Sequence, residues 1–385
     1  MRARNASKVQ SKINMVVYGA PFSGKSTLCS QFAYMKTPEG KPFRVLYLDA
    51  ETSSIEDYLP ELEKNGVKLD NIYICYTQSL EECKQYIEMA KNKDPFPVID
   101  ENGEEVDGEY VKDADGEIFH PDAIVLDGAS ILSTTMKQGI VDFSKKRASV
   151  KADKQGIIGD ERFVKVASAG IELKDYQTIN FKSQDLILLL AGCGLNYVVT
   201  CREKEEVQNK LVNGETVSVH TGKKIIDGLK NIDYNTKTIL WLHRDDDDYE
   251  TVKATVVKDR TGVHTAGEIL EDPSLLDWQE IITKTAKNKK YAVENTLSDA
   301  VKKEKEMFEK ENNFEDDSKT DNKSVELDEL RSKILKLKKS MNPVVDNKYK
   351  TELKKVSLNK NPKNIDDKEA LKKMLKIAED IIKAK

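Results

Sequence analysis

The chain has 385 residues, of which 38% are hydrophobic and 34% charged, and its formal net charge is −5. This length accommodates one large domain and a smaller one, and the composition is typical of a soluble, charge-rich protein. The longest apolar run, Leu186–Ala191, is far shorter than the roughly 18 residues of a membrane helix. We therefore expect no association with a membrane.

Five cysteines and four histidines are scattered along the chain without a C-x-x-C pair. This spacing favours neither a disulfide framework nor a zinc site, and it is typical of a reducing compartment. The basic N-terminal residues lack the apolar stretch of a signal peptide. The sequence therefore predicts a cytoplasmic protein.

Charge is distributed unevenly. From Lys284 onward there are 27 Lys and Arg against 20 Asp and Glu, whereas the preceding part has 35 against 47. From Arg331 to the end the numbers are 17 against 7. The basic C-terminal end can contact nucleic acid or a partner protein, or it can be an ordinary solvated face.

The first predicted element is a buried strand at 13–18 that runs into a glycine-rich loop, and a helix at 25–36 leaves that loop. The loop reads GAPFSGKST and matches the phosphate-binding pattern G-x-x-x-x-G-K-[ST]. A strand, a loop and a helix in this order form the context that confirms such a loop. The expected nucleotide-binding residues are Gly19, Ala20, Pro21, Phe22, Ser23, Gly24, Lys25, Ser26 and Thr27.

The chemistry of phosphate binding explains these residue types. Gly19 and Gly24 allow a tight turn that points backbone N–H groups at phosphate oxygens, and Lys25 can reach the β- and γ-phosphates. The Ser26 hydroxyl can ligate Mg²⁺ beside the positive end of the helix dipole. The loop therefore predicts a site for a nucleotide with Mg²⁺.

The next strand, at 44–49, ends in the sequence Asp49-Ala50-Glu51. Carboxylates two residues apart share one face of an extended chain. Glu51 is the candidate base that activates a water molecule for hydrolysis. An acidic cluster that caps a following helix is the alternative interpretation.

After a strand at 71–77 and a helix at 79–92, residues 98–119 contain Asn-Gly and Asp-Gly pairs, which predict one or two inserted hairpins at the surface. The strand at 123–127 then ends in Asp127. Ligands of α/β proteins bind at the carboxyl ends of parallel strands, so Asp127 is the second candidate to hold Mg²⁺, through its waters. A turn residue at the strand end is the alternative.

Residues 137–160 are polar and basic, with glycines at 156 and 159, and they indicate a mobile loop or a frayed helix. A helix at 181–192 and strands at 196–200, 238–243 and about 250–257 complete this part of the chain. The alternation of short apolar strands with helices predicts an α/β fold with a mostly parallel sheet covered on both faces.

The last of these strands leads into Lys258-Asp259-Arg260-Thr261-Gly262. Two cations placed this way can reach the γ-phosphate held by a neighbouring subunit and stabilise charge in the transition state. Lys258 and Arg260 are therefore candidate catalytic residues. A solvated strand end with a turn at Gly262 is the alternative.

The C-terminal part predicts a charged linker at 284–327 and a basic helical module at 328–385, after an N-terminal arm at 1–12 and a core at 13–283. One helical face is formed by Leu327, Leu330, Ile334, Leu337 and Met341. The pair Asp366 and Glu369 resembles a capping box. A second face follows it, formed by Leu371, Met374, Leu375, Ala378 and Ile382.

In this order, the phosphate loop, Asp49-x-Glu51, Asp127 and Lys258-x-Arg260-x-Gly262 resemble the core of RecA, RadA and the DnaB helicase. Within that group the chain is most similar to the phage RecA-like ATPases associated with single-strand annealing and recombination. The resemblance covers roughly residues 10–275. It implies a RecA-like P-loop NTPase core in which Lys25 and the loop backbone bind ATP, Ser26 and Asp127 hold Mg²⁺, and Glu51 activates water.

The resemblance also implies that Lys258 and Arg260 act in trans, across the subunit interface of a ring or filament. After the strand at 196–200, this chain has Cys201-Arg202, where RecA-group proteins often carry Asn-Gln or Ser-Gln. Thr200 is therefore the first candidate for the γ-phosphate sensor and Arg202 the second. The family's DNA loops correspond to about 137–160 and 203–224, and the candidate DNA-binding residues are Lys145, Lys146, Arg147, Lys151 and Lys154.

Three functions remain open. The first is a DNA-dependent ATPase of phage recombination or replication, a homo-oligomer on single-stranded DNA in the host cytoplasm, which can also meet a single-strand-binding protein or another phage protein. The second is an accessory ATPase, such as a helicase loader or partition factor, that acts through a protein partner. The third is a small-molecule kinase, in which Lys258, Arg260 and the basic C-terminal end have no use.

Overall fold

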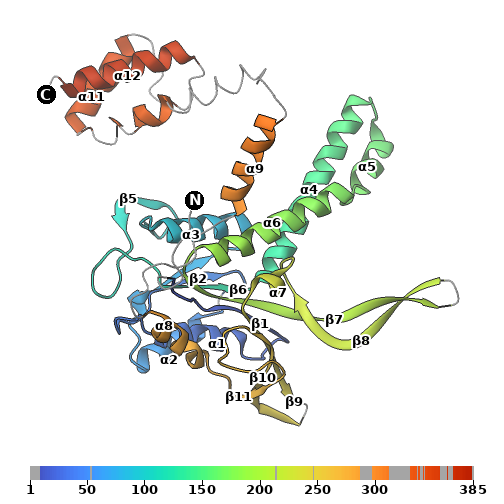
Figure 1. The fold of residues 1–385 in the computed structure, drawn as a ribbon. Helices are drawn as coiled ribbons and strands as arrows, with labels where there is room; N and C mark the ends of the chain where they lie inside the picture. Colours follow the sequence, from blue (N-terminus) through green and yellow to red (C-terminus); the bar gives the residue numbers. More distant parts are fainter. Residues whose placement is uncertain are drawn as a thin grey trace. The chain divides into compact units, whose positions relative to one another are not determined.

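The computed structural model describes residues 9–52, 54–212, 215–245, 247–286, 297–311, 330–335, 337–338, 341, 343–355, 362 and 367–383. The chain divides into two compact units, Met1–Val301 and Lys302–Lys385 (Figure 1).

A nine-stranded sheet forms the centre of the first unit, in the order β11–β10–β9–β1–β7–β6–β2–β3, with β8 paired to β7. The strands from β9 to β3 in this order run parallel, whereas β8, β10 and β11 pair antiparallel with their neighbours. The strands of this sheet are β1 (Asn14–Gly19), β2 (Val45–Asp49), β3 (Ile72–Tyr76), β6 (Ala123–Asp127), β7 (Asn196–Val212), β8 (Glu215–Asp227), β9 (Thr238–Asp245), β10 (Asp248–Asp259) and β11 (Ile269–Glu271).

Helices cover both faces of this sheet. Successive side chains of a strand point to opposite faces, and in β1 Val16 and Tyr18 join one buried cluster while Met15 and Val17 join the other. The first cluster includes residues of α3 (Leu80–Asn92), α4 (Ala129–Lys154), α6 (Leu173–Gly192) and α7 (Ile232–Asn235). The second includes residues of α1 (Lys25–Ser30), η2 (Gln31–Tyr34), η5 (Leu275–Trp278) and α8 (Gln279–Ala286). The expected α/β architecture is confirmed.

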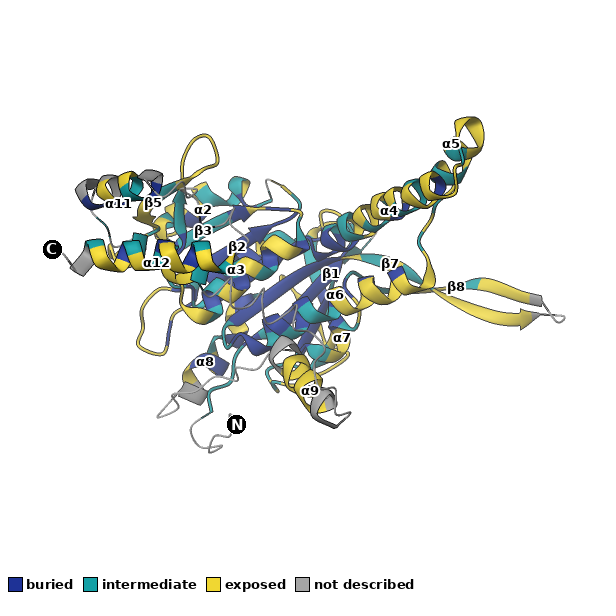
Figure 2. Cartoon of the chain, turned by 90° about the horizontal axis from the view of Figure 1, so that it is seen from above, coloured by how far each residue is buried: buried dark blue, intermediate teal, exposed yellow. Residues whose placement is uncertain are grey.

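The expectation of a mobile loop or frayed helix at 137–160 is wrong. Helix α4 continues without interruption to Lys154, and α5 (Gly159–Ala167) follows after a short turn. Arg147 on α4 donates hydrogen bonds to Asp175 on α6 at 2.8 and 3.1 Å and lies 3.4 Å from Glu172. Asp175 also accepts the backbone N–H of Glu172 at 2.9 Å. The polar residues that suggested a loop are the solvent side of a helical arm, residues 137–182 of α4, α5 and α6 (Figure 2).

The hairpin β7–β8 is the second projection from the sheet (Figure 1). The predicted strand at 196–200 is only its beginning, because β7 continues to Val212 and pairs with β8 along most of that length. Outside the sheet the side chains of this hairpin are mostly exposed. An exposed strand needs no apolar run, so its sequence carries little of the signal that reveals a buried strand.

Residues 97–119 form a third projection. Strands β4 (Pro97–Ile99) and β5 (Glu105–Tyr110) pair antiparallel. At the turn between them, Asp100 accepts the backbone N–H groups of Asn102 and Glu104, both at 2.9 Å. A second turn is flanked by an antiparallel bridge between Lys112 and Ile118. Short aspartate-anchored turns are what the Asn-Gly and Asp-Gly pairs predict.

The first unit also has the short helices η3 (Glu56–Tyr58), α2 (Leu59–Lys64) and η4 (Leu69–Asn71). Helix α9 (Leu297–Glu311) spans the division between the units, and α11 (Pro343–Lys355) and α12 (Lys368–Lys383) belong to the second unit. In the second unit a small core joins Ile334, Tyr349, Leu353, Leu371, Met374 and Ala378, with Leu330, Leu337, Met341 and Leu375 packed against it. The two predicted apolar faces therefore meet, together with α11, which the sequence pattern did not predict. Leu327, Asp366 and the side chain of Ile382 lie outside the described residues.

Asp175→Ala is expected to loosen α6 from α4 without disturbing the sheet, because it removes the carboxylate that holds Arg147. The guanidinium keeps the pKa of Asp175 well below its usual range, so the ion pair persists at neutral pH and is lost only in strong acid. Hydrogen exchange of residues 140–180 should become several-fold faster, with little change elsewhere. Asp160→Ala, at an exposed position of α5, is the matched control, and equal exchange in both variants would contradict this role.

Candidate nucleotide-binding site

The phosphate-binding loop follows β1 at the carboxyl edge of the sheet. Its first glycine, Gly19, lies between Leu242 of β9 and Arg202 of β7 in the strand register. A Cβ atom at Gly19 would lie 2.2 Å from the Leu242 carbonyl oxygen. Gly24 has φ of +86°, in the left-handed region. Both glycines are therefore required by geometry, one by close approach and one by backbone conformation.

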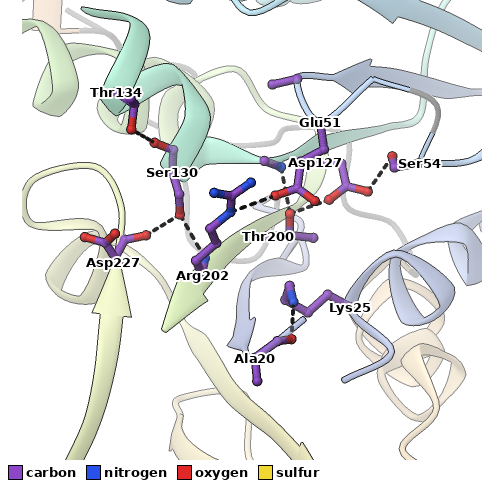
Figure 3. A network of polar contacts seen from close by, with 12 residues as sticks. Ala20, Lys25, Glu51, Ser54, Asp127, Ser130, Thr134, Thr200, Arg202 and Asp227 are labelled. Atoms are coloured by element: carbon purple, nitrogen blue, oxygen red, sulfur yellow. Dashed lines mark hydrogen bonds and ion pairs between the residues drawn. The ribbon is translucent and has the colours of Figure 1, made fainter. Parts of the chain in front are cut away.

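Lys25 lies over this loop. Its Nζ donates to the carbonyl oxygen of Ala20 at 2.7 Å (Figure 3) and to that of Gly19 at 3.2 Å. Burial lowers the pKa of Lys25, and the nearby carboxylates of Glu51 and Asp127 oppose that shift. A half-buried ammonium group with two acidic neighbours is an electrostatic environment suited to an anionic ligand accompanied by a divalent cation.

Asp127 lies at the end of β6, where its carboxylate is almost completely buried. Its Oδ2 accepts a hydrogen bond from the Tyr47 hydroxyl at 2.6 Å. Oδ2 also accepts one from Ser54 at 2.9 Å, and Oδ1 accepts one from Thr200 (Figure 3). All three partners are neutral donors, so they orient the carboxylate without neutralising it. Oδ1 keeps an acceptor site for a further ligand, such as a metal-bound water.

Thr200 connects two strands of the site. It lies on β7, which separates β1 from β6 in the sheet, and its hydroxyl oxygen also accepts the backbone N–H of Gly128 at 2.8 Å. The predicted sensor position thus lies between the strand of the phosphate loop and the strand of Asp127. Its hydroxyl is engaged with the acidic residue that is expected to hold Mg²⁺.

The two carboxylates at the end of β2, Asp49 and Glu51, have different surroundings. Asp49 is fully buried and accepts the backbone N–H groups of Glu51 at 3.0 Å and Ser54 at 2.8 Å. It therefore holds the turn after β2. Burial raises the pKa of Asp49, although these N–H groups oppose the shift. Glu51 is partly exposed, and Arg202 lies 3.3 Å from its Oε1. The candidate base and the second candidate sensor are thus an ion pair.

The other two predicted catalytic residues, Lys258 and Arg260, lie away from the phosphate loop of the same chain. Lys258 and Asp259 pair with Ile239 and Thr238 at the start of β9, whereas the phosphate loop lies beside the end of that strand. Lys258 Nζ donates to the Asp233 carbonyl oxygen at 2.6 Å, and Arg260 is exposed. A single chain does not bring this pair to its own phosphate loop, and action in trans stays a prediction.

The five candidate DNA-binding residues all lie on α4. Lys145, Lys146, Lys151 and Lys154 are exposed, but Arg147 is engaged with Asp175 and Glu172. Since Arg147 joins α4 to α6, its charge is already compensated within the arm. The predicted set therefore separates into four exposed lysines and one arginine that stabilises the arm.

Sequence reasoning missed several residues of this site. Tyr47 is a tyrosine in a buried strand. Because a buried hydroxyl needs a hydrogen-bond partner, its residue type was the sequence feature that could have indicated a polar contact here. Arg244, at the end of β9, donates to the carbonyl oxygens of Phe22 at 3.2 Å and Glu250 at 2.8 Å. It thereby ties the tip of the phosphate loop to the β9–β10 turn. No sequence pattern marks Arg244 for this contact.

These residues fit a nucleotide with Mg²⁺. The loop provides a cradle in which a side chain at Gly19 would clash, and its lysine lies beside it. Asp127 is oriented by three hydroxyl groups, and Ser26 follows Lys25 in the first turn of α1. Hydroxyl and carboxylate oxygens are the ligands that Mg²⁺ prefers. Of the described residues, no helix is long and apolar enough to cross a membrane.

No protein-family model and no curated protein matches this chain. Among solved structures, it is similar to the crystal structure of the KaiC-like protein PH0186 from the hyperthermophilic archaeon Pyrococcus horikoshii OT3. The alignment has 11% sequence identity and a TM-score of 0.35, and it covers 70% of this chain and 99% of that one. A likeness this weak carries no weight for fold or function. The chain's own strand order and phosphate loop define an α/β fold of the P-loop kind.

Gly128→Ala is expected to disrupt the site more than the fold. Gly128 has φ of +98°, and a Cβ atom there would lie 2.6 Å from Glu51 Cγ and 3.1 Å from its backbone N. The strained backbone should cost about 1–3 kcal/mol of unfolding free energy, and Glu51 must move. Denaturant unfolding and nucleotide binding measure the two effects. Gly139→Ala, which meets no atom within 4 Å, is the control, and equal effects would contradict the assignment.

Proposed function

We propose that this chain binds ATP with Mg²⁺ and hydrolyses the β–γ bond. The observation that carries the proposal is the convergence of Lys25, Glu51 and Asp127 at the carboxyl ends of β1, β2 and β6, beside Thr200 of β7. Ligands of open α/β sheets bind at this edge. A phosphate-binding loop with its lysine, an oriented aspartate and a separate glutamate are the groups that phosphoryl transfer to water requires.

Each residue has a distinct part in this proposal. Lys25 and the loop N–H groups hold the phosphates, and Ser26 and Asp127 hold the metal, which when bound neutralises phosphate charge. Glu51 orients or deprotonates the attacking water, for which its ion pair with Arg202 must open. Thr200 acts as the γ-phosphate sensor, and its hydrogen bond to Asp127 supports this role.

We propose further that ATP turnover is coupled to single-stranded DNA in phage recombination or replication, and that the chain acts as a homo-oligomer. Support comes from the two projections that begin at the site. Strand β7 carries Thr200 and Arg202 before it continues into the β7–β8 hairpin, and α4 starts directly after Asp127 and Gly128. Single-stranded DNA that contacts the β7–β8 hairpin or the helical arm can therefore act on the catalytic residues. A single-strand-binding protein or another replication protein is a further candidate partner.

The first test is ATP hydrolysis with and without single-stranded DNA at low and high salt. Lys25→Ala should lower turnover about 100-fold or more, because the phosphates lose their main positive partner. Stimulation by DNA that falls with salt is expected, since counterion release drives binding to phosphates. Lys25-dependent turnover that is indifferent to DNA would instead indicate an accessory ATPase with a protein partner.

Mixing two inactive variants tests whether Arg260 acts in trans. Arg260→Ala and Glu51→Ala should each be inactive alone. In a mixed oligomer some interfaces combine an intact Glu51 with an intact Arg260, so part of the activity should return. Turnover measured across mixing ratios checks this, and no rescue at any ratio would remove Arg260 from the mechanism.

A further inference from the structure

The inserted hairpin segment, residues 97–119, is strongly acidic. It contains nine Asp and Glu but only one Lys. Asp113 is paired with Arg44 at 3.5 Å, and Asp115 with Lys68 at 3.7 Å. In the part of the chain that the structure describes, no ion pair engages the exposed carboxylates Glu101, Glu104, Glu105, Asp107 and Glu109. The same segment exposes the apolar side chains Ile99, Tyr110 and Ile118.

The helical arm, residues 137–182, has the opposite character. It contains ten Lys and Arg against six Asp and Glu. Four of its carboxylates are engaged inside the arm, in ion pairs of Asp142, Asp153, Glu172 and Asp175. On the exposed side of α4, Lys146, Lys151 and Lys154 lie within ion-pair distance of no described carboxylate. The arm therefore presents uncompensated positive charge.

The arm also exposes an unusual number of large apolar side chains. Ile158, Leu173 and Phe163 are 82%, 78% and 72% exposed. Phe143, Val150, Val164, Tyr176 and Phe181 are exposed as well. Single exposed apolar residues need no explanation, but seven on three consecutive helices, with Ile158 just before α5, indicate a surface that a partner covers.

The composition of the arm favours a protein partner over nucleic acid. Single-stranded DNA stacks its bases on aromatic rings, which half of these eight side chains provide, whereas the other half are aliphatic: Val150, Ile158, Val164 and Leu173. Aliphatic and aromatic groups together, with charge around them, are typical of a protein interface. The hairpin segment supplies the matching surface, with free carboxylates and its own exposed apolar side chains.

These two surfaces cannot meet within one chain, because Figures 1 and 2 both place β5 and the α4–α5 arm on opposite sides of the first unit. We propose that the helical arm of one copy docks on the hairpin segment of a second copy. The contact joins two different surfaces, so it is heterologous, and repetition gives a ring or a filament. Helix α4 begins next to Asp127, so the arm that makes the contact continues from the nucleotide site of the same copy.

Charge reversal tests the proposal by sedimentation velocity on the full chain, without nucleotide or DNA. The wild type should associate as concentration rises, less so at high salt. The triple variant K146E, K151E and K154E, or the hairpin triple variant E104K, E105K and D107K, should each weaken association about tenfold or more. Combining the six substitutions restores opposite charges across the contact, so association should return.

E61K with E63K on α2, at exposed positions, is the matched control and should leave association unchanged. Ile158→Ser with Phe163→Ser removes apolar surface without changing charge, and it should also weaken association. A wild type that stays monomeric, an ineffective triple variant or a combination without rescue would overturn the proposal. The proposal would also be overturned if the arm variant lost DNA binding but still associated as the wild type does. None of these readouts requires ATP hydrolysis, so this proposal and the proposed function fail separately.

Discussion

The buried carboxylate of Asp127 is the constraint around which the site is organised. A buried charge is tolerated only when hydrogen bonds satisfy it, and here the donors come from β2, from the turn after β2 and from β7. Each of these donors lies at least 73 positions from Asp127 in the sequence. Their hydroxyl groups meet at one carboxylate only when the strand order and register of the sheet are correct, so the acidic end of the site and the fold depend on each other.

The same arrangement links the site to two projections of the first unit, the helical arm and the β7–β8 hairpin. Thr200 is bonded to Asp127 and to the backbone of Gly128, from which α4 starts. Two residues beyond Thr200, Arg202 contacts Glu51 and β7 continues into its hairpin. A displacement of either projection therefore reaches a carboxylate through one or two hydrogen bonds. These hydrogen bonds are therefore a short path by which a bound macromolecule can affect the residues beside the phosphate loop.

Exposed elements were the hardest to predict. The central strands are buried on both faces, so their apolar runs stand out in the sequence. Residues 137–160 suggest a mobile loop or a frayed helix because most of them are polar and face water, whereas Arg147 within them is held by Asp175, 28 positions away. Tyr349 and α11 were missed for a related reason, since their packing partners come from other helices. Contacts between distant residues have no local signature.

By itself, the sequence determined the phosphate loop, its lysine, the aspartate at the end of a buried strand and the alternation that produces a parallel sheet. These features are local, because backbone conformation and apolar periodicity act over a few neighbouring residues. Only the tertiary structure decided that Glu51 faces Arg202, that Arg244 holds the loop tip, and that Lys258 lies at the opposite edge from the phosphate loop. Each of these depends on the order and direction in which strands far apart in the chain associate.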